Sequence, residues 1–135
     1  MSASITLSRR LASQLLHLAQ ISPDAEVCGI VSQKNQQPQR CYPIKNIASN
    51  PATAFLFDPA EHISTMKTLR ERGEEILAIY HSHPSAPATP SALDVANVAD
   101  ENVLHFIISL STKGILELRA FNIAQNQATE LRITL

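Results

Sequence analysis

A nearly continuous apolar run, ILAIY at 76–80, restricts the fold of this chain more than any other feature. A run without the polar alternation of a half-exposed strand is typical of a central strand that is covered on both faces. Helical patterns occur before and after it in the sequence. We therefore predict an α/β fold in which helices cover the faces of one mixed central sheet.

Two helices are predicted before that strand, and each has a recognisable start. Ser8 is a candidate cap for a helix that runs to about Gln20, with leucines at helical spacing. Asp58, followed by Pro59, begins a second helix that stops at Gly73. The apolar residues expected to point inward from this second helix are Ile63, Met66 and Leu69.

The other apolar runs predict strands and a short helix. A strand at 27–31 contains Gly29, where another group could approach the backbone closely. A polar turn at 34–39 leads to a returning strand at 40–44, and a short helix is expected at 92–99. Strands at 103–110, 115–123 and 129–135, with a turn at 113–114, would complete an antiparallel meander.

Length and composition indicate one domain over residues 1–135 and exclude several classes of function. A formal net charge of −1 provides no basic surface for nucleic acid, and no apolar run is long enough to cross a bilayer. Cys28 and Cys41 do not form a disulfide framework, and the N-terminus carries no secretory signal. We therefore expect a cytoplasmic protein.

The stretch HSHPSAPATPSALD, residues 81–94, carries the candidate metal ligands. Residues two apart on a strand share a face, so His81 and His83 can direct both imidazoles to one point while Ser82 turns away. A loop stiffened by prolines leads to Asp94 in the first turn of the next helix. Two imidazoles and one carboxylate make a three-ligand zinc set with a fourth position open for water.

Simpler interpretations exist for several of these residues. The remaining histidines, His17, His62 and His105, are expected to be ordinary surface or core residues. Ser91 and Asp94 also fit a capping box that opens a helix. Both roles are compatible, because an aspartate in the first turn can serve the helix dipole and a cation together.

The pattern H-x-H-P-x6-S-x2-D formed by HSHP, Ser91 and Asp94 resembles the motif of the JAMM (MPN-plus) metalloprotease family. That family also uses an upstream glutamate, and Glu26 in EVCGIV matches it. The resemblance extends over nearly the whole chain, through FLFDPAEH, ILAIYHSHP, FIISL and LRAFNI. It is strongest to the small prokaryotic branch, which consists of little more than the catalytic core.

The resemblance implies a cytidine-deaminase-like α/β/α fold and one zinc ion per chain, held by His81, His83 and Asp94. The deaminases' own H-x-E and P-C-x-x-C pattern is absent, so base deamination is not expected. Family members cleave peptide or isopeptide bonds after the C-terminal glycines of ubiquitin-like proteins. The prokaryotic branch is associated with ubiquitin-like sulfur carriers, from which it releases an amino acid, a peptide or a lysine.

The same resemblance assigns the catalytic roles. Glu26 would take a proton from the attacking water and return it to the leaving amine, and Ser91 would donate a hydrogen bond to the oxyanion. A nucleophilic Cys28 is disfavoured, because no histidine remains to activate it and cysteine packs readily as a small hydrophobe.

Two other functions stay open at this point, a non-catalytic MPN scaffold and a hydrolase for small amides. The first is disfavoured because such scaffolds generally lose the metal ligands, whereas this chain keeps them. An extended Gly-Gly tail could pair with a strand edge beside the site. The strand after Gly29 and the segment 49–57 are the candidate walls of that path. The sequence does not indicate an oligomeric state.

Overall fold

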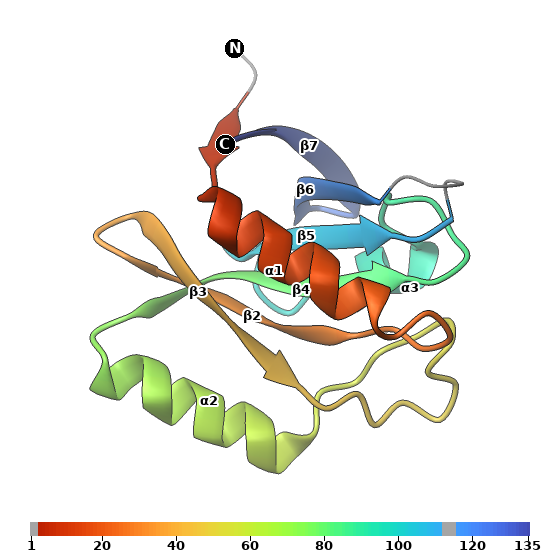
Figure 1. Ribbon diagram of the computed structural model, residues 1–135, viewed down its shortest axis with the longest axis horizontal. Coiled ribbons are helices and arrows are strands. Elements are labelled where there is room, and N and C mark those ends of the chain that lie inside the picture. Colours follow the sequence, from red (N-terminus) through yellow and green to blue (C-terminus); the bar gives the residue numbers. More distant parts are fainter. Residues whose placement is uncertain (1–2, 112–115) are drawn as a thin grey trace.

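The computed structural model describes residues 3–111 and 116–135 and contains one mixed sheet in the order β1-β7-β6-β5-β4-β2-β3 (Figure 1). The helices are α1 (Arg9–Gln20), α2 (Pro59–Glu71) and α3 (Ala92–Ala96). The strands are β1 (Ser4–Thr6), β2 (Cys28–Lys34), β3 (Gln37–Ile44), β4 (Glu75–His83), β5 (Leu104–Ser109), β6 (Glu117–Ala124) and β7 (Gln127–Thr134). β4 is parallel to β5, and β1 to β7; the other pairs are antiparallel.

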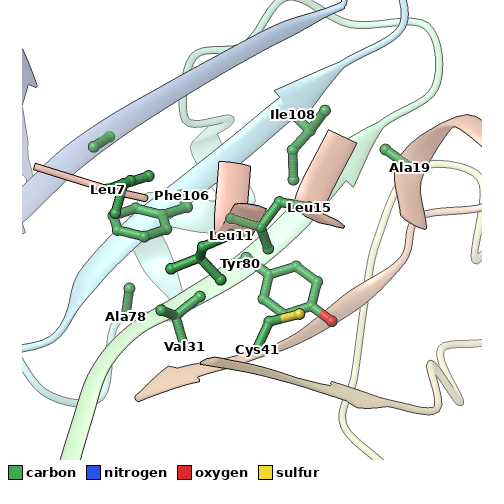
Figure 2. Packing of buried hydrophobic residues seen from close by; sticks show 11 residues of the cluster. Leu7, Leu11, Leu15, Ala19, Val31, Cys41, Ala78, Tyr80, Phe106 and Ile108 are labelled. Atoms are coloured by element: carbon green, nitrogen blue, oxygen red, sulfur yellow. The ribbon is translucent and has the colours of Figure 1, made fainter. Parts of the chain in front are cut away.

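Helices cover both faces of this sheet, which confirms the predicted layered α/β fold. Leucines of α1, among them Leu11 and Leu15, pack with Val31 of β2, Tyr80 of β4 and Phe106 of β5 on one face (Figure 2). The opposite face carries two smaller clusters, one under α2 and one beside α3. Because successive residues of a strand point to opposite faces, β4 supplies core residues to one layer and site residues to the other.

Helix starts agree with the sequence prediction. The side-chain oxygen of Ser8 accepts a hydrogen bond from Leu11 N, and that of Asp58 accepts one from Glu61 N. α2 ends just before Gly73, which adopts φ 68°, a conformation that glycine tolerates at a helix end. The antiparallel meander β5-β6-β7 is also confirmed, while the predicted turn at 113–114 and the start of the strand at 115 lie outside the described residues.

Three sequence predictions about these elements were wrong. Ile63 of α2 points outward and is 71% exposed, whereas Leu69 is buried. Each step of three residues falls about 60° short of a full helical turn, so Ile63 lies roughly 120° around the helix from Leu69. α3 ends at Ala96 rather than 99, because the backbone leaves the helical conformation at Asn97, with φ −97° and ψ 11°.

The third error concerns the polar run at 34–39. Only Asn35 and Gln36 form the turn, both with positive φ, and the strands on either side extend into the rest of the run. Two residues with φ near +60° are the usual solution for a tight hairpin, because that backbone twist matches the twist of the paired strands. The polar side chains of this run therefore lie on a hairpin end and not on a loop.

Gly29 is close to another group, as predicted, but that group belongs to the protein itself. A Cβ at Gly29 would collide with the carbonyl oxygen of Tyr42 and with the ring of Tyr80. The glycine therefore makes room for a buried tyrosine. Among the described residues, no helix is long and apolar enough to cross a membrane.

Candidate metal centre

β4 ends with the two histidines on the same face of the sheet. The side chains of His81 and His83 are 1% and 4% exposed, and their Nε2 atoms lie 3.1 Å apart. Ser82, between them, turns to the other side, where its hydroxyl accepts a hydrogen bond from Val27 N at 2.9 Å. The predicted convergence of the two imidazoles is therefore present in the structure.

The loop from Pro84 to Pro90 is fixed by contacts at three successive residues. The hydroxyl of Ser109 donates to the carbonyl of Ala86 at 2.7 Å, and Nδ1 of His83 donates to the carbonyl of Pro87 at 2.7 Å. The side chain of Ala88 is buried against the core beside α3. These contacts, in addition to the prolines, return the chain to the histidines.

The return places Asp94 beside both imidazoles. Its Oδ2 atom lies 3.1 Å from Nε2 of His81 and 3.2 Å from Nε2 of His83. The same oxygen accepts a hydrogen bond from Ser91 N at 2.8 Å, while Ser91 Oγ accepts from Asp94 N at 3.0 Å. The capping box and the candidate ligand set therefore share one carboxylate.

The three donor atoms fit a tetrahedral cation. Their separations are 3.1, 3.1 and 3.2 Å, close to the roughly 3.3–3.4 Å that separates ligands on a tetrahedral zinc with bonds of about 2.0–2.1 Å. Because a carbonyl can only accept, the proton of neutral His83 is on Nδ1, facing Pro87. In this neutral form Nε2 presents a lone pair to the lone pairs of Asp94, so the contact becomes favourable only with a second proton on His83, which makes a hydrogen bond, or with a cation between the two groups.

The charges of the three groups follow from their burial and mutual contacts. Burial raises the pKa of Asp94, but hydrogen bonds from His81 and His83 outweigh it and hold the pKa well below its usual range. Burial lowers the pKa of His81, so this imidazole is neutral at pH 7. Burial also lowers the pKa of His83, but the hydrogen bond to Asp94 dominates and raises it. An ionised carboxylate beside a neutral imidazole is the form that metals bind.

Glu26 lies beside this group on the same face of the sheet. β2 and β4 pair Cys28 with His81, and Val27 bonds with Ser82, so the continued register places Glu26 opposite His83. A carboxylate oxygen of Glu26 and a ring nitrogen of each histidine lie within 4.8 Å of one another. Groups this close can be bridged by one water molecule.

The carboxyl group of Glu26 has an unusual environment. The residue is 5% exposed, and its Oε1 atom has no hydrogen-bond partner among the described residues. Burial raises its pKa to about 7, although the nearby His83 opposes that shift. A carboxyl group with a pKa near neutrality can both accept and return a proton at pH 7.

Phe55 is part of the site, although the sequence prediction included it only within the candidate wall 49–57. Its ring stacks on the imidazole of His81, with centroids 4.6 Å apart and an interplanar angle of 24°. The other candidate wall, the strand after Gly29, cannot pair with a substrate tail through its backbone. β2 is paired along both edges, with β3 and with β4, so it has no free edge for a substrate tail.

Cys28 and the three histidines outside the motif lie in surroundings that fit structural roles. Cys28 is 2% exposed, donates to the carbonyl of Ile44 at 3.3 Å, and has a pKa raised to about 12 by burial and by Glu26. A thiol in this state is a poor nucleophile. His17 and His62 are exposed, whereas His105 is buried, and its Nε2 has no partner among the described residues.

Comparison with known protein families gives a match over most of the chain. The model of the family described as prokaryotic homologs of the JAB domain matches residues 8–124. The desampylase of Haloferax volcanii is 30% identical over 89 residues, which are 64% of this chain and 64% of that protein. The CysO-cysteine peptidase of Mycobacterium tuberculosis is 27% identical over 120 residues, or 87% of this chain and 81% of that protein.

A third relative matches a shorter segment. The probable TtuB-protein conjugate cleaving protease of Thermus thermophilus is 42% identical over 60 residues, which are 44% of this chain and 40% of that protein. The matched segments thus span less than two thirds of the Haloferax protein and less than half of the Thermus protein.

Solved structures give the same fold. A protein from Desulfitobacterium hafniense superposes with a TM-score of 0.85 at 30% identity, covering 97% of this chain and 92% of that one. A JAB1/MPN domain protein from Archaeoglobus fulgidus gives a TM-score of 0.61 at 17% identity, covering 98% and 99%. A structure described as a JAMM metalloprotease-like zinc site gives 0.58 at 16%, covering 100% of both chains. The last two support the fold alone.

Proposed function

We propose that this chain, which belongs to the family of prokaryotic homologs of the JAB domain, is a zinc-dependent peptidase acting on ubiquitin-like sulfur-carrier proteins. It would hydrolyse the amide bond after the carrier's C-terminal glycines and release an amino acid, a peptide or a lysine. The observation that carries this proposal is the triangle of donor atoms from His81, His83 and Asp94 beside the buried carboxyl of Glu26.

The relatives support the class of substrate. By their names, one releases CysO from cysteine, one cleaves TtuB-protein conjugates, and one is a desampylase. Three relatives that act on different conjugates favour hydrolysis at a carrier's C-terminus as the shared reaction. Both cysteines are free and buried, as is usual in a reducing compartment, which supports a cytoplasmic location.

His81, His83 and Asp94 would hold the metal, and we propose zinc because two imidazoles and one carboxylate are a typical set for catalytic zinc. Zinc held there supplies Lewis acidity, which lowers the pKa of a water molecule from about 15.7 toward roughly 7. The carbonyl of Pro87 keeps the proton of His83 on Nδ1 and leaves Nε2 free to bind. Ser91 N holds the oxygen of Asp94 that faces both imidazoles.

Glu26 carries out the proton transfers in this proposal. Its unpartnered Oε1 accepts the proton of the attacking water and then delivers it to the leaving nitrogen, so that the amine departs neutral. Ser91 stabilises the oxyanion. Its Oγ accepts from Asp94 N, and among the described residues nothing accepts its hydroxyl hydrogen, which is therefore available for substrate.

The test is hydrolysis of a sulfur carrier fused through its terminal glycine to an amino acid, followed by mass spectrometry. Zinc-loaded protein should cleave the fusion, and a chelator should stop the reaction. Glu26→Gln should lower kcat by about 10²–10⁴-fold with zinc still bound, because it removes a general base but no ligand. Glu71→Gln, at an exposed position of α2, is the matched control and should leave kcat unchanged.

Either of two outcomes would contradict the proposal and favour another function. A zinc-loaded protein that binds carriers tightly but cleaves no fusion would be a scaffold. Equal kcat/KM for the fusion and for a short peptide of the same C-terminal sequence would indicate a hydrolase for small amides that does not recognise the carrier.

A further inference from the structure

The side chain of Asn46, just beyond β3, uses its full hydrogen-bonding capacity. Its Nδ2 donates to the carbonyls of Glu26 and Ala54, both at 3.0 Å. Its Oδ1 accepts from the backbone N–H groups of Ala48 and Leu56, also both at 3.0 Å. An amide has two donor hydrogens and one acceptor oxygen with two lone pairs, so all four positions are occupied.

These bonds join Glu26 to the segment 46–57. Glu26 precedes β2, and the strand register positions it only through Val27, because the hydrogen bonds that the structure shows for its own N–H and carbonyl groups do not go to β4. Its N–H instead donates to the carbonyl of Pro51 at 2.7 Å, and its carbonyl accepts from Asn46. Both backbone polar groups of the proposed proton-transfer residue are therefore bound by this one segment.

The same segment also contacts a metal ligand. Phe55, next to two residues that Asn46 binds, stacks on His81 at 4.6 Å. The segment is closed by a second set of backbone bonds, from Ile47 N to Leu56 O at 2.8 Å and from Asp58 N to Lys45 O at 3.0 Å. Asn46 lies inside this closed segment and is the side chain that connects it to Glu26.

We propose that Asn46 is a positioning residue for Glu26, an inference that rests on the proposed function for its catalytic consequence. Among the residues that the structure describes, Oε1 of Glu26 has no hydrogen-bond partner, so its distance from the histidines depends on where the backbone is held. A displacement of about 1 Å in a reacting group can lower a rate by roughly 10²-fold. Asn46 acts through Glu26 and does not touch the substrate or the metal.

Two variants distinguish the donor side of the Asn46 amide from its acceptor side. Asn46→Ala removes all four bonds, whereas Asn46→Asp keeps an acceptor for Ala48 and Leu56 but has no donor for Glu26. Both variants should lower kcat by about 10–100-fold while the zinc content stays unchanged. The kinetics are measured under conditions in which urea titration shows that each variant is fully folded. Asn122→Ala is the matched control. Asn122 lies on β6, which β5 separates from β4, and its amide donates one long hydrogen bond, 3.3 Å, to the carbonyl of Glu101.

A double-mutant cycle tests whether Asn46 acts through Glu26. In the Glu26→Gln background, Asn46→Ala should change kcat by less than about twofold, because the group it positions is already lost. An equal fold-change in both backgrounds would overturn the proposal. Wild-type kcat in Asn46→Asp would also overturn it.

Amide hydrogen exchange gives a readout that does not depend on activity. By NMR, the N–H groups of Ala48 and Leu56 should exchange roughly 10-fold faster in Asn46→Ala, because they lose their acceptor. The Glu26 N–H should exchange faster by a similar factor, with or without zinc, because its bond to Pro51 O opens more often once the carbonyl of Glu26 is no longer held by Asn46. In Asn46→Asp, only the Glu26 N–H should show this acceleration. Unchanged exchange at Glu26 in both variants would overturn the inference even if no carrier is cleaved, whereas absence of cleavage by the unmodified protein would contradict only the proposed function.

Discussion

The three candidate ligands differ in the contact that orients each side chain. Nδ1 of His83 has the carbonyl of Pro87, and the inward oxygen of Asp94 has the N–H of Ser91. Nδ1 of His81 has no partner among the described residues, and this ring is instead stacked against Phe55. The imidazole of His81 is therefore oriented by packing, and that of His83 by a hydrogen bond.

At the same scale, Ser91→Ala should reveal whether this serine is more than a cap. The loss of the cap should cost about 1 kcal/mol of stability, and the loss of an oxyanion donor should lower kcat by about 10²–10³-fold. Zinc should stay bound, because Ser91 N, which holds Asp94, is unaffected. Urea titration and steady-state kinetics measure the two effects.

Ser8→Ala is the matched control, because Ser8 caps α1 in the same way and lies outside the site. It should lower stability by a similar amount, about 1 kcal/mol, and leave kcat unchanged. If Ser91→Ala affects kcat no more than Ser8→Ala does, the serine is only a helix cap.

Strand β4 connects a structural cluster at its start to the candidate metal centre at its end. Glu74, just before β4, is 7% exposed, and its carboxylate accepts from Ser32 at 2.8 Å and from Tyr42 at 2.7 Å. Arg40 lies 3.2 Å from the second oxygen. This cluster ties β2 and β3 to the beginning of β4, and so supports the register that places Glu26 opposite His83.

At the scale of elements, we expect Glu74→Gln to lower the free energy of unfolding by about 2–3 kcal/mol at pH 7, because it removes a charged acceptor of buried hydrogen bonds. Burial raises the pKa of Glu74, but hydrogen bonds from Tyr42 and Ser32 and the charge of Arg40 outweigh it, so the pKa lies below 4.5. The carboxylate therefore stabilises the fold fully above pH 4.5.

That contribution is lost as the pH falls from 4.5 through the folded-state pKa. The difference in urea midpoint between the wild type and Glu74→Gln should shrink over this range. Glu75→Gln, at the exposed neighbouring position, should match the wild type throughout. A difference for Glu74→Gln that does not change with pH would show that the carboxylate charge contributes nothing.

The candidate metal centre joins parts of the molecule that are distant in sequence. The end of β4, the loop after it, α3 and the residues before β2 meet at one point on the face of the sheet opposite α1. A cation bound there would link these elements in the folded state only. Metal binding should therefore stabilise the molecule as a whole.

At this scale, zinc at 1,000 times its dissociation constant should raise the free energy of unfolding by about 4 kcal/mol. Thermal unfolding with zinc and with chelator measures this increment. His83→Ala should abolish it, and His17→Ala, at an exposed position of α1, should retain it. An equal increment in both variants would place the stabilising zinc elsewhere.

The layered fold and the donor set were predictable because their signals are local. An apolar run marks a buried strand, caps mark helix starts, and a spacing of two places His81 and His83 on one face. The sequence predictions were wrong where a local pattern is compatible with more than one structure. The three-residue spacing from Ile63 to Leu69 does not determine which residues of α2 face the sheet, and the polar run before β3 does not mark where its turn begins.

The sequence by itself therefore determined which residues are available for metal chemistry, since HSHP, Ser91 and Asp94 have a spacing that strand and helix periodicity convert into proximity. Only the tertiary structure decided how Glu26 reaches them and what holds it there. Its position depends on the register of β2 with β4 and on the amide of Asn46, twenty residues further along the chain. Contacts between residues that far apart leave no periodic signal in a sequence, because they exist only once the sheet has formed.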